Sequence, residues 1–108
     1  MNEYCRKYLS DVLGSIQFIN DSIGTFTFAE YKTNRLLKSA VERHFEIIGE
    51  ALNQALKIDP TLPLTNKQQI VGMRNRIIHA YDAVDDLMIY DAAAQHLKTL
   101  QKEIEHLL

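Results

Sequence analysis

One short segment of this sequence, residues 72–85, combines side chains that suit phosphodiester chemistry. Arg74 is followed by Asn75, and His79 and Tyr81 come five and seven residues after the arginine. A histidine can transfer protons near neutral pH because its ordinary pKa lies close to neutrality. An arginine can bind a phosphate through two parallel hydrogen bonds and offset developing negative charge. RNA carries its own nucleophile, the 2′-hydroxyl, so its cleavage needs neither a metal ion nor a nucleophile from the protein.

Helical geometry separates the two central groups of this segment. Asn75 and His79 lie one turn apart on the same side of a helix. Arg74 and His79 are five positions apart, so they point about 140° away from each other. Three arrangements would bring them together: the helix loosens near His79, the arginine stem curls around the helix, or two copies of the segment face each other. We favour the third, which predicts a site at the interface of a homodimer.

Each of these residues also has a purely structural interpretation. His79 near a helix C-terminus interacts favourably with the helix dipole without any catalytic role. Arg74 can be a surface salt-bridge partner, and Tyr81 can belong to the core as the end of an apolar stripe. Spacing alone favours this interpretation, because an arginine and a histidine five residues apart are a weak signal.

The other histidines lack a partner motif. His44 lies on the apolar side of its predicted helix, which indicates a packed or boundary position. His96 and His106 fall in the last predicted helix, where we expect solvated faces.

A stripe of glutamates, Glu42, Glu46 and Glu50, recurs at four-residue steps. Such a stripe is typical of a solvent-exposed face or of pairing with nearby Arg43, and without other ligands it does not predict a metal site. Gly49 interrupts the same helix with its low helix propensity, so we expect it to mark close packing against another helix.

The elements that must position these residues are helices. A first helix over residues 2–23 carries apolar residues at three- and four-residue steps and stops at Gly24. A long second helix begins at the capping box of Thr27 and Glu30 and continues to Ile58. Pro60 and Pro63 then mark the clearest break in the chain.

Two further helices complete the expected fold. The third begins at a capping box that starts with Thr65, and its apolar face comprises Ile70, Met73, Ile77 and Tyr81. The fourth starts after the cap Asp85 and reaches the C-terminus. Strand signals are almost absent. The sequence therefore predicts an all-α antiparallel four-helix bundle, with room for an extra short helix.

Size and charge limit the function. The 108 residues fit a single domain, 1–108, with a modest core that self-association would enlarge. The net charge of −2 argues against a strongly basic nucleic-acid coat protein. Any positive surface for RNA must be local, and Arg74 and Arg76 can form such a groove, doubled in a dimer.

The compartment follows from what the sequence lacks. The single cysteine, Cys5, allows no internal disulfide and no zinc pattern, so a reducing environment is the default. We find no signal peptide and no apolar run long enough to span a membrane, and we expect a cytoplasmic protein without a membrane partner.

The segment over residues 74–81 resembles the RX4HXY motif of HepT-like toxins in the HEPN superfamily. The upstream run Glu-Ile-Ile-Gly-Glu-Ala at residues 46–51 is similar to a second recurring block of that family, and Gly72-Met73 matches the usual entry into the motif. The order of these blocks, the proline-containing loop and the apolar C-terminal helix extend the resemblance over nearly the whole chain. The motif itself is Arg74-Asn75-Arg76-Ile77-Ile78-His79-Ala80-Tyr81.

The resemblance implies a helical homodimer that acts as a metal-independent endoribonuclease, without a cofactor, on tRNA or mRNA. It assigns phosphate binding to Arg74, proton transfer to His79 and a supporting role to Asn75. It also implies a type VII toxin–antitoxin system, in which a nucleotidyltransferase antitoxin of the MntA type transfers AMP to Tyr81. Such a charged group beside His79 would repel the RNA backbone and block access, as a switch requires.

Two other functions remain open at the level of sequence. The chain can be a non-catalytic interaction module whose motif is the docking or acceptor surface for a nucleotidyltransferase, and the acidic charge favours this modestly. It can also be a nucleotide-binding helical domain without RNA chemistry.

Overall fold

The computed structural model describes all residues, 1–108, as a helical fold without strands. Its elements follow the order α1 (Glu3–Ile23), α2 (Phe28–Thr33), α3 (Arg35–Ile58), α4 (Lys67–His79), the 3-10 helix η1 (Tyr81–Ala83), α5 (Asp86–Ala94) and α6 (His96–Leu107). The expected all-α bundle is confirmed. None of its helices has the length and hydropathy of a membrane-spanning segment.

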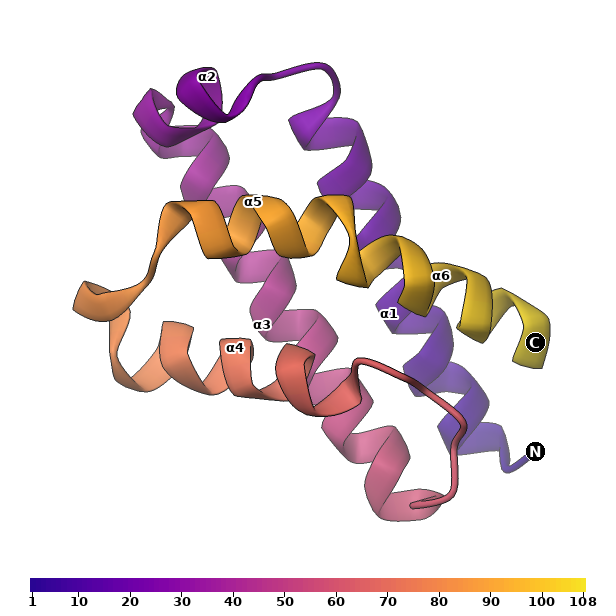
Figure 1. The fold of residues 1–108 in the computed structure, drawn as a ribbon. Coiled ribbons are helices and arrows are strands. Elements are labelled where there is room, and N and C mark those ends of the chain that lie inside the picture. Colours follow the sequence, from indigo (N-terminus) through magenta and orange to yellow (C-terminus); the bar gives the residue numbers. More distant parts are fainter.

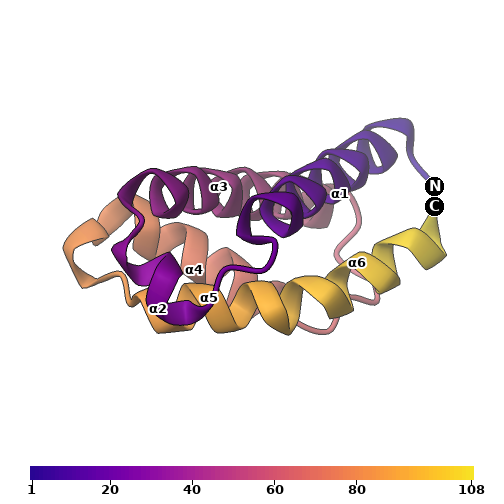
Figure 2. The ribbon, with the colours of Figure 1, turned by 90° about the horizontal axis from the view of Figure 1, so that it is seen from above.

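The helices form two layers. The antiparallel helices α1 and α3 make the most extensive contact in the molecule and form one layer. Helix α4 and the consecutive helices α5 and α6 run across this pair in the second layer (Figures 1 and 2). The motif helix α4 therefore has α3 beneath it, which determines what its arginine can contact.

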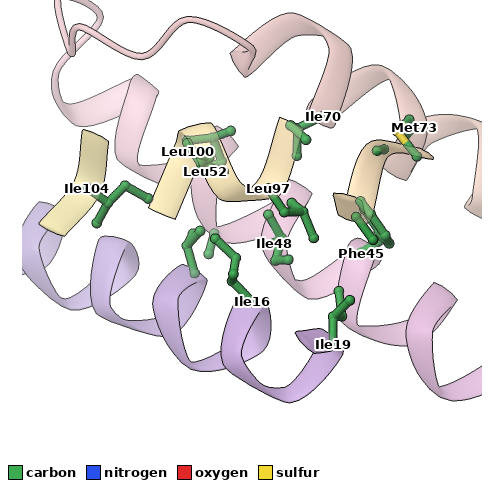
Figure 3. Packing of buried hydrophobic residues seen from close by; sticks show 14 of the residues in the cluster. Ile16, Ile19, Phe45, Ile48, Leu52, Ile70, Met73, Leu97, Leu100 and Ile104 are labelled. Atoms are coloured by element: carbon green, nitrogen blue, oxygen red, sulfur yellow. The ribbon is translucent and has the colours of Figure 1, made fainter. Parts of the chain in front are cut away.

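The core lies between the layers, where the predicted apolar stripes meet (Figure 3). Val12, Ile16 and Ile19 of α1 are fully buried, as are Phe45 and Ile48 of α3. The facing layer contributes Ile70, Leu97, Leu100 and Ile104, which are fully buried, and Met73, which is nearly so.

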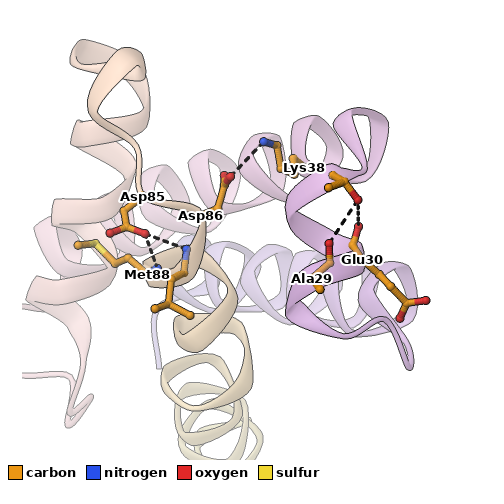
Figure 4. Close-up of polar contacts among 8 residues, drawn as sticks. Ala29, Glu30, Lys38, Asp85, Asp86 and Met88 are labelled. Carbon is orange, nitrogen blue, oxygen red and sulfur yellow. Dashed lines mark hydrogen bonds and ion pairs between the residues drawn. The ribbon is translucent and has the colours of Figure 1, made fainter.

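Several helix ends match the sequence predictions. Gly24 ends α1 with a φ of +50°, a conformation that favours glycine. Thr27 and Glu30 form the predicted reciprocal capping box of α2. Asp85 accepts hydrogen bonds from the backbone N–H groups of Leu87 and Met88 at the start of α5 (Figure 4).

Both long helices of the prediction are interrupted. Residues 28–58 divide at Asn34, whose side chain accepts a hydrogen bond from the Leu37 N–H at 3.0 Å and so caps a new helix. The last helix changes direction at Gln95, between α5 and α6. Lys38 and Asp86, 3.1 Å apart, connect α3 to α5 beside the first break (Figure 4).

The boundaries of α4 also differ from the prediction. Thr65 does not cap it: its hydroxyl donates instead to Glu103 of α6 at 2.7 Å, and α4 begins two residues later without a side-chain cap. At the other end α4 stops at His79, because Ala80 leaves helical geometry. Tyr81 therefore lies outside the helix and is 80% exposed, so the expected extension of the apolar face to Tyr81 is wrong.

Candidate functional site

Helix α4 turns one face into the core and leaves the motif residues around its flanks. Ile70, Met73 and Ile77 are buried and fix the rotation of the helix. Arg74 follows a buried position and reaches across the surface of α3, whereas His79 is exposed at the last position of the helix. The two residues thus leave α4 in different directions, as the helical geometry predicted.

The stem of Arg74 lies directly on Gly49 of α3. A Cβ atom at position 49 would overlap the Cβ of Arg74 and lie 2.7 Å from its Cγ. Only glycine leaves room for this approach, since the atoms concerned are next to the α4 backbone and cannot swing away. The predicted close packing at Gly49 is confirmed, and its partner is the motif arginine.

The guanidinium of Arg74 is fixed by hydrogen bonds at both terminal nitrogens. Nη2 donates to Oε2 of Glu50 at 2.7 Å, and Nη1 donates to Oδ1 of Asn75, also at 2.7 Å. The other oxygen of Glu50, Oε1, accepts from Nε2 of Gln54 at 2.9 Å. The Arg74 side chain is 24% exposed, and its Nε is buried without a hydrogen-bond partner. A chain of polar contacts therefore runs from α3 to α4.

The Arg74 guanidinium lies at the edge of a groove of about 640 Å³ between α1, α3 and α4. Its lining includes the apolar side chains Tyr8, Ile47 and Ile78. A second arginine of the groove, Arg43, pairs with Glu46 at 3.1 Å, just as Arg74 pairs with Glu50. Both cations are balanced by carboxylates of α3, so the groove is not a positive surface in the single chain.

Arg76 occupies the other flank of α4. Its Nη1 donates to the sulfur of Met88 in α5 at 3.4 Å, and it lines a separate groove with Met88 and His96. Within one chain Arg74 and Arg76 therefore do not form the single positive groove that the sequence suggested.

The C-terminal end of the motif is open to solvent. His79 is exposed, the Ala80 N–H donates to the Arg76 carbonyl at 2.9 Å, and Tyr81 begins the short helix η1. Asn75 shares the His79 side of α4 by position, yet its side-chain oxygen binds Arg74. The chain thus brings Asn75 to Arg74 and leaves the His79 imidazole and the Tyr81 hydroxyl apart from both.

Two residues of this site were missing from the sequence prediction. Glu50 was expected to face solvent or to pair with Arg43, but it pairs with Arg74 from 24 positions away. Gln54, one turn further along α3, was not singled out at all. Two sequence signals were indirect. Glu50 belongs to the block at residues 46–51 that resembles the family, and a helix-interior glycine marks where another helix approaches, so its neighbour Glu50 can contact that helix.

Of the other histidines, His44 lies where the sequence predicted and His96 does not. His44 is half-buried as expected, with Nδ1 3.0 Å from Oγ of Ser15 and its ring stacked on Phe18 at 3.9 Å between centroids. Burial, with a smaller contribution from the charge of Arg43, lowers the pKa of His44. His96 is not on a solvated face: it is half-buried and its Nδ1 is enclosed without a partner.

The glutamate stripe of α3 does not converge with other ligands. No group of three or more His, Cys, Asp or Glu side chains is arranged to hold a metal ion. Glu46 and Glu50 pair with arginines, as described above. Burial, together with the nearby charge of Asp86, raises the pKa of Glu42.

Comparison with known proteins agrees with the sequence resemblance. The family described as "Ribonuclease HepT-like" matches residues 12–107. The chain is 30% identical over 104 residues to "Putative RNase MJ0125" of Methanocaldococcus jannaschii, covering 95% of this chain and 90% of that protein. It is 27% identical over 106 residues to "Probable ribonuclease HepT" of Thermococcus cleftensis, covering 94% of each. No solved structure matches the chain significantly.

Proposed function

Since the chain belongs to the HepT-like ribonuclease family of the HEPN superfamily, we propose that it is a toxin that cleaves RNA endonucleolytically without a metal ion. Residues 1–108 are its single domain, and tRNA or mRNA is the substrate. One observation carries the proposal: α4 presents a guanidinium that is fixed on α3 and, at its end, an imidazole that is free to meet a substrate.

The chemistry needs these two groups alone. The 2′-oxygen of RNA attacks the adjacent phosphorus, the bond to the 5′-oxygen breaks, and a cyclic phosphate remains on the upstream fragment. His79 accepts the proton of the 2′-hydroxyl and, once protonated, returns it to the leaving 5′-oxygen. Arg74 binds the phosphate oxygens, where negative charge increases in the transition state.

The site is completed by a second copy of the chain. Arg74 and His79 leave α4 in different directions, and within the chain Arg74 contacts Glu50 and Asn75 rather than His79. A twofold axis beside α4 would place the His79 of one protomer against the Arg74 of the other.

Replacement of His79 tests the activity. We expect His79→Ala to reduce the rate of RNA cleavage by at least about 100-fold, as loss of a general acid–base does. Purified protein and a labelled RNA would be used, with circular dichroism to verify folding. His106→Ala is the matched control, because His106 is an exposed histidine at the other end of the fold. Cleavage at the wild-type rate by folded His79→Ala protein would refute the proposal.

Mixing two inactive variants tests the composite site. When Arg74→Ala and His79→Ala chains form a heterodimer, one of its two sites receives both an intact arginine and an intact histidine. Half of randomly mixed dimers are heterodimers, so the mixture should regain about a quarter of wild-type activity. If the mixture stays as inactive as either variant, each site belongs to one chain and the composite arrangement is wrong.

We further propose that the protein forms a type VII toxin–antitoxin pair with a nucleotidyltransferase of the MntA type. The Tyr81 oxygen would attack the α-phosphorus of ATP and release pyrophosphate, leaving AMP on the tyrosine. The exposure of Tyr81 supports this acceptor role, because a transferase must reach the hydroxyl. The AMP phosphate would then add negative charge two residues from His79 and repel RNA.

A second candidate function is a non-catalytic partner of that transferase. The observation that favours it is the Glu50–Arg74 pair, which neutralises the motif arginine within the chain. In this case the wild-type protein would not cleave RNA, yet it would bind the transferase and gain one AMP by intact-mass measurement. Cleavage that depends on His79 would eliminate this candidate.

A further inference from the structure

We infer that Glu50 is a positioning residue for Arg74: its carboxylate fixes the guanidinium so that two N–H groups remain free for the scissile phosphate. This inference rests on the proposed function, because it assigns a purpose to a contact beside the same site. Glu50 itself is on α3, outside the RX4HXY segment.

The carboxylate is itself fixed, as a positioning group must be. Oε1 of Glu50 accepts from Gln54 at 2.9 Å while Oε2 accepts from Arg74 at 2.7 Å. Gly49, the preceding residue, lets the arginine stem lie on the α3 backbone. Helix α3 therefore positions the Arg74 stem through Gly49 and the Arg74 guanidinium through Glu50.

The remaining donors of Arg74 suit a phosphate. A guanidinium has five N–H groups, of which one on Nη2 binds Glu50 and one on Nη1 binds Asn75. Nε is buried, so its N–H is not available. Nη1 and Nη2 each retain one N–H, and these are the donors left for a phosphate while Glu50 stays bound.

The pair is better explained by positioning than by stability. The Glu50 side chain is 45% exposed, and an ion pair this accessible to water contributes little to folding. A guanidinium that is already fixed, in contrast, loses less freedom when it binds a phosphate and places its donors where charge develops. Removal of Glu50 should therefore leave the fold intact and impair the reaction.

Three variants test the inference on the full chain. Glu50→Ala removes the contact. Glu50→Gln retains an oxygen for Arg74, since Gln54 can turn its amide to accept from the new side chain. Glu46→Ala is the matched control, because Glu46 is one turn away on the same groove, pairs with Arg43 and carries the same charge.

Kinetics on a single-stranded RNA oligonucleotide provide the first measurement. We expect Glu50→Ala to lower kcat by about 10- to 100-fold, as misplacement of a catalytic group does, with little change in KM. Glu50→Gln should recover most of this loss, and Glu46→Ala should match the wild type. A kcat of Glu50→Ala that equals or exceeds the wild-type kcat would overturn the inference. A lower KM in the same variant would show that the carboxylate competes with RNA for Arg74.

Nitrogen-15 NMR of the arginine side chains provides a second measurement, independent of cleavage. A fixed guanidinium rotates slowly about its Cζ–Nη bonds, so Arg74 should give resolved Nη signals, which Arg74→Lys would assign. These signals should persist in Glu50→Gln and collapse in Glu50→Ala. An inactive wild-type protein would refute the proposed function, whereas Nη signals of Arg74 that do not change in Glu50→Ala would refute the inference alone.

Discussion

The two ends of the motif differ in how firmly the chain fixes them. Arg74 lies against Gly49, binds Glu50 and Asn75, and keeps a quarter of its exposure. His79 is five residues further along the same helix, exposed, at the point where helical geometry ends. One chain thus builds the phosphate-binding half of the proposed site completely and leaves the proton-transfer half open.

In the proposed function, this contrast would let a small domain carry a site that another molecule completes or blocks. The fixed half needs no ligand to form, because its contacts lie within α3 and α4. The open half is accessible to a second copy, to RNA or to a modifying enzyme. Changes to the packing at Gly49 in the fixed half should therefore affect folding and catalysis together, whereas changes at the open half should affect function alone.

The largest expected effect on stability is at the fixed half, for Gly49→Ala. The new methyl group would overlap the Arg74 stem, so α3 and α4 must separate, and overpacking of this kind costs about 1–3 kcal/mol. Urea denaturation should show this loss, and cleavage should fall as Arg74 moves.

Gly14→Ala is the control for this change. Gly14 lines the same groove from α1 but has open space around it. Its replacement should raise the free energy of unfolding by roughly 0.5–1 kcal/mol through helix propensity. If both alanines stabilise the protein equally, the close approach at Gly49 is not what fixes Arg74.

The sequence predicted the parts of this contrast that depend on local patterns. The capping box at Thr27, the cap at Asp85 and the stop at Gly24 are properties of neighbouring residues, and all three are confirmed. The divergence of Arg74 and His79 followed from helical periodicity and agrees with the structure.

The parts that were missed depend on contacts between distant segments. Thr65 has the pattern of a cap, but Glu103, 38 positions away, competes for its hydroxyl. Glu50 has the pattern of a surface stripe, and only the crossing of α4 over α3 brings it to Arg74. Tyr81 continued the apolar period in sequence, whereas the chain leaves the helix one residue earlier, at Ala80.

A smaller loss of stability is expected at acidic pH, from the protonation of His44. The pKa of His44 is lowered in the folded state, mainly by burial. The contribution of His44 to stability is therefore complete above the unfolded-state pKa of about 6.5. It is lost as the pH falls through the lower folded-state pKa, because the unfolded chain then binds the proton more readily.

His44→Phe would remove this titration and retain the stack on Phe18. Urea denaturation of both proteins between about pH 7.5 and pH 5 would measure it, since the difference between them cancels the other titrating groups. The wild type should lose more stability than His44→Phe as the pH falls. Parallel curves would mean that burial does not lower the pKa of His44 in the folded protein.

The smallest effect on folding is expected at the open half, for Tyr81→Phe. The hydroxyl is removed from a side chain that is 80% exposed and outside the core, so the free energy of unfolding should change by no more than about 0.5 kcal/mol. RNA cleavage should remain at the wild-type rate, because the proposed chemistry assigns no step to this oxygen. The variant should nevertheless escape inhibition by the nucleotidyltransferase and ATP, and intact-mass measurement should show no added AMP.

The matched control is Tyr4→Phe, another exposed tyrosine hydroxyl, on α1, which should leave modification intact. A Tyr81→Phe protein that is still modified and silenced would place the acceptor elsewhere, and one that unfolds more easily would show that the open half is structural after all.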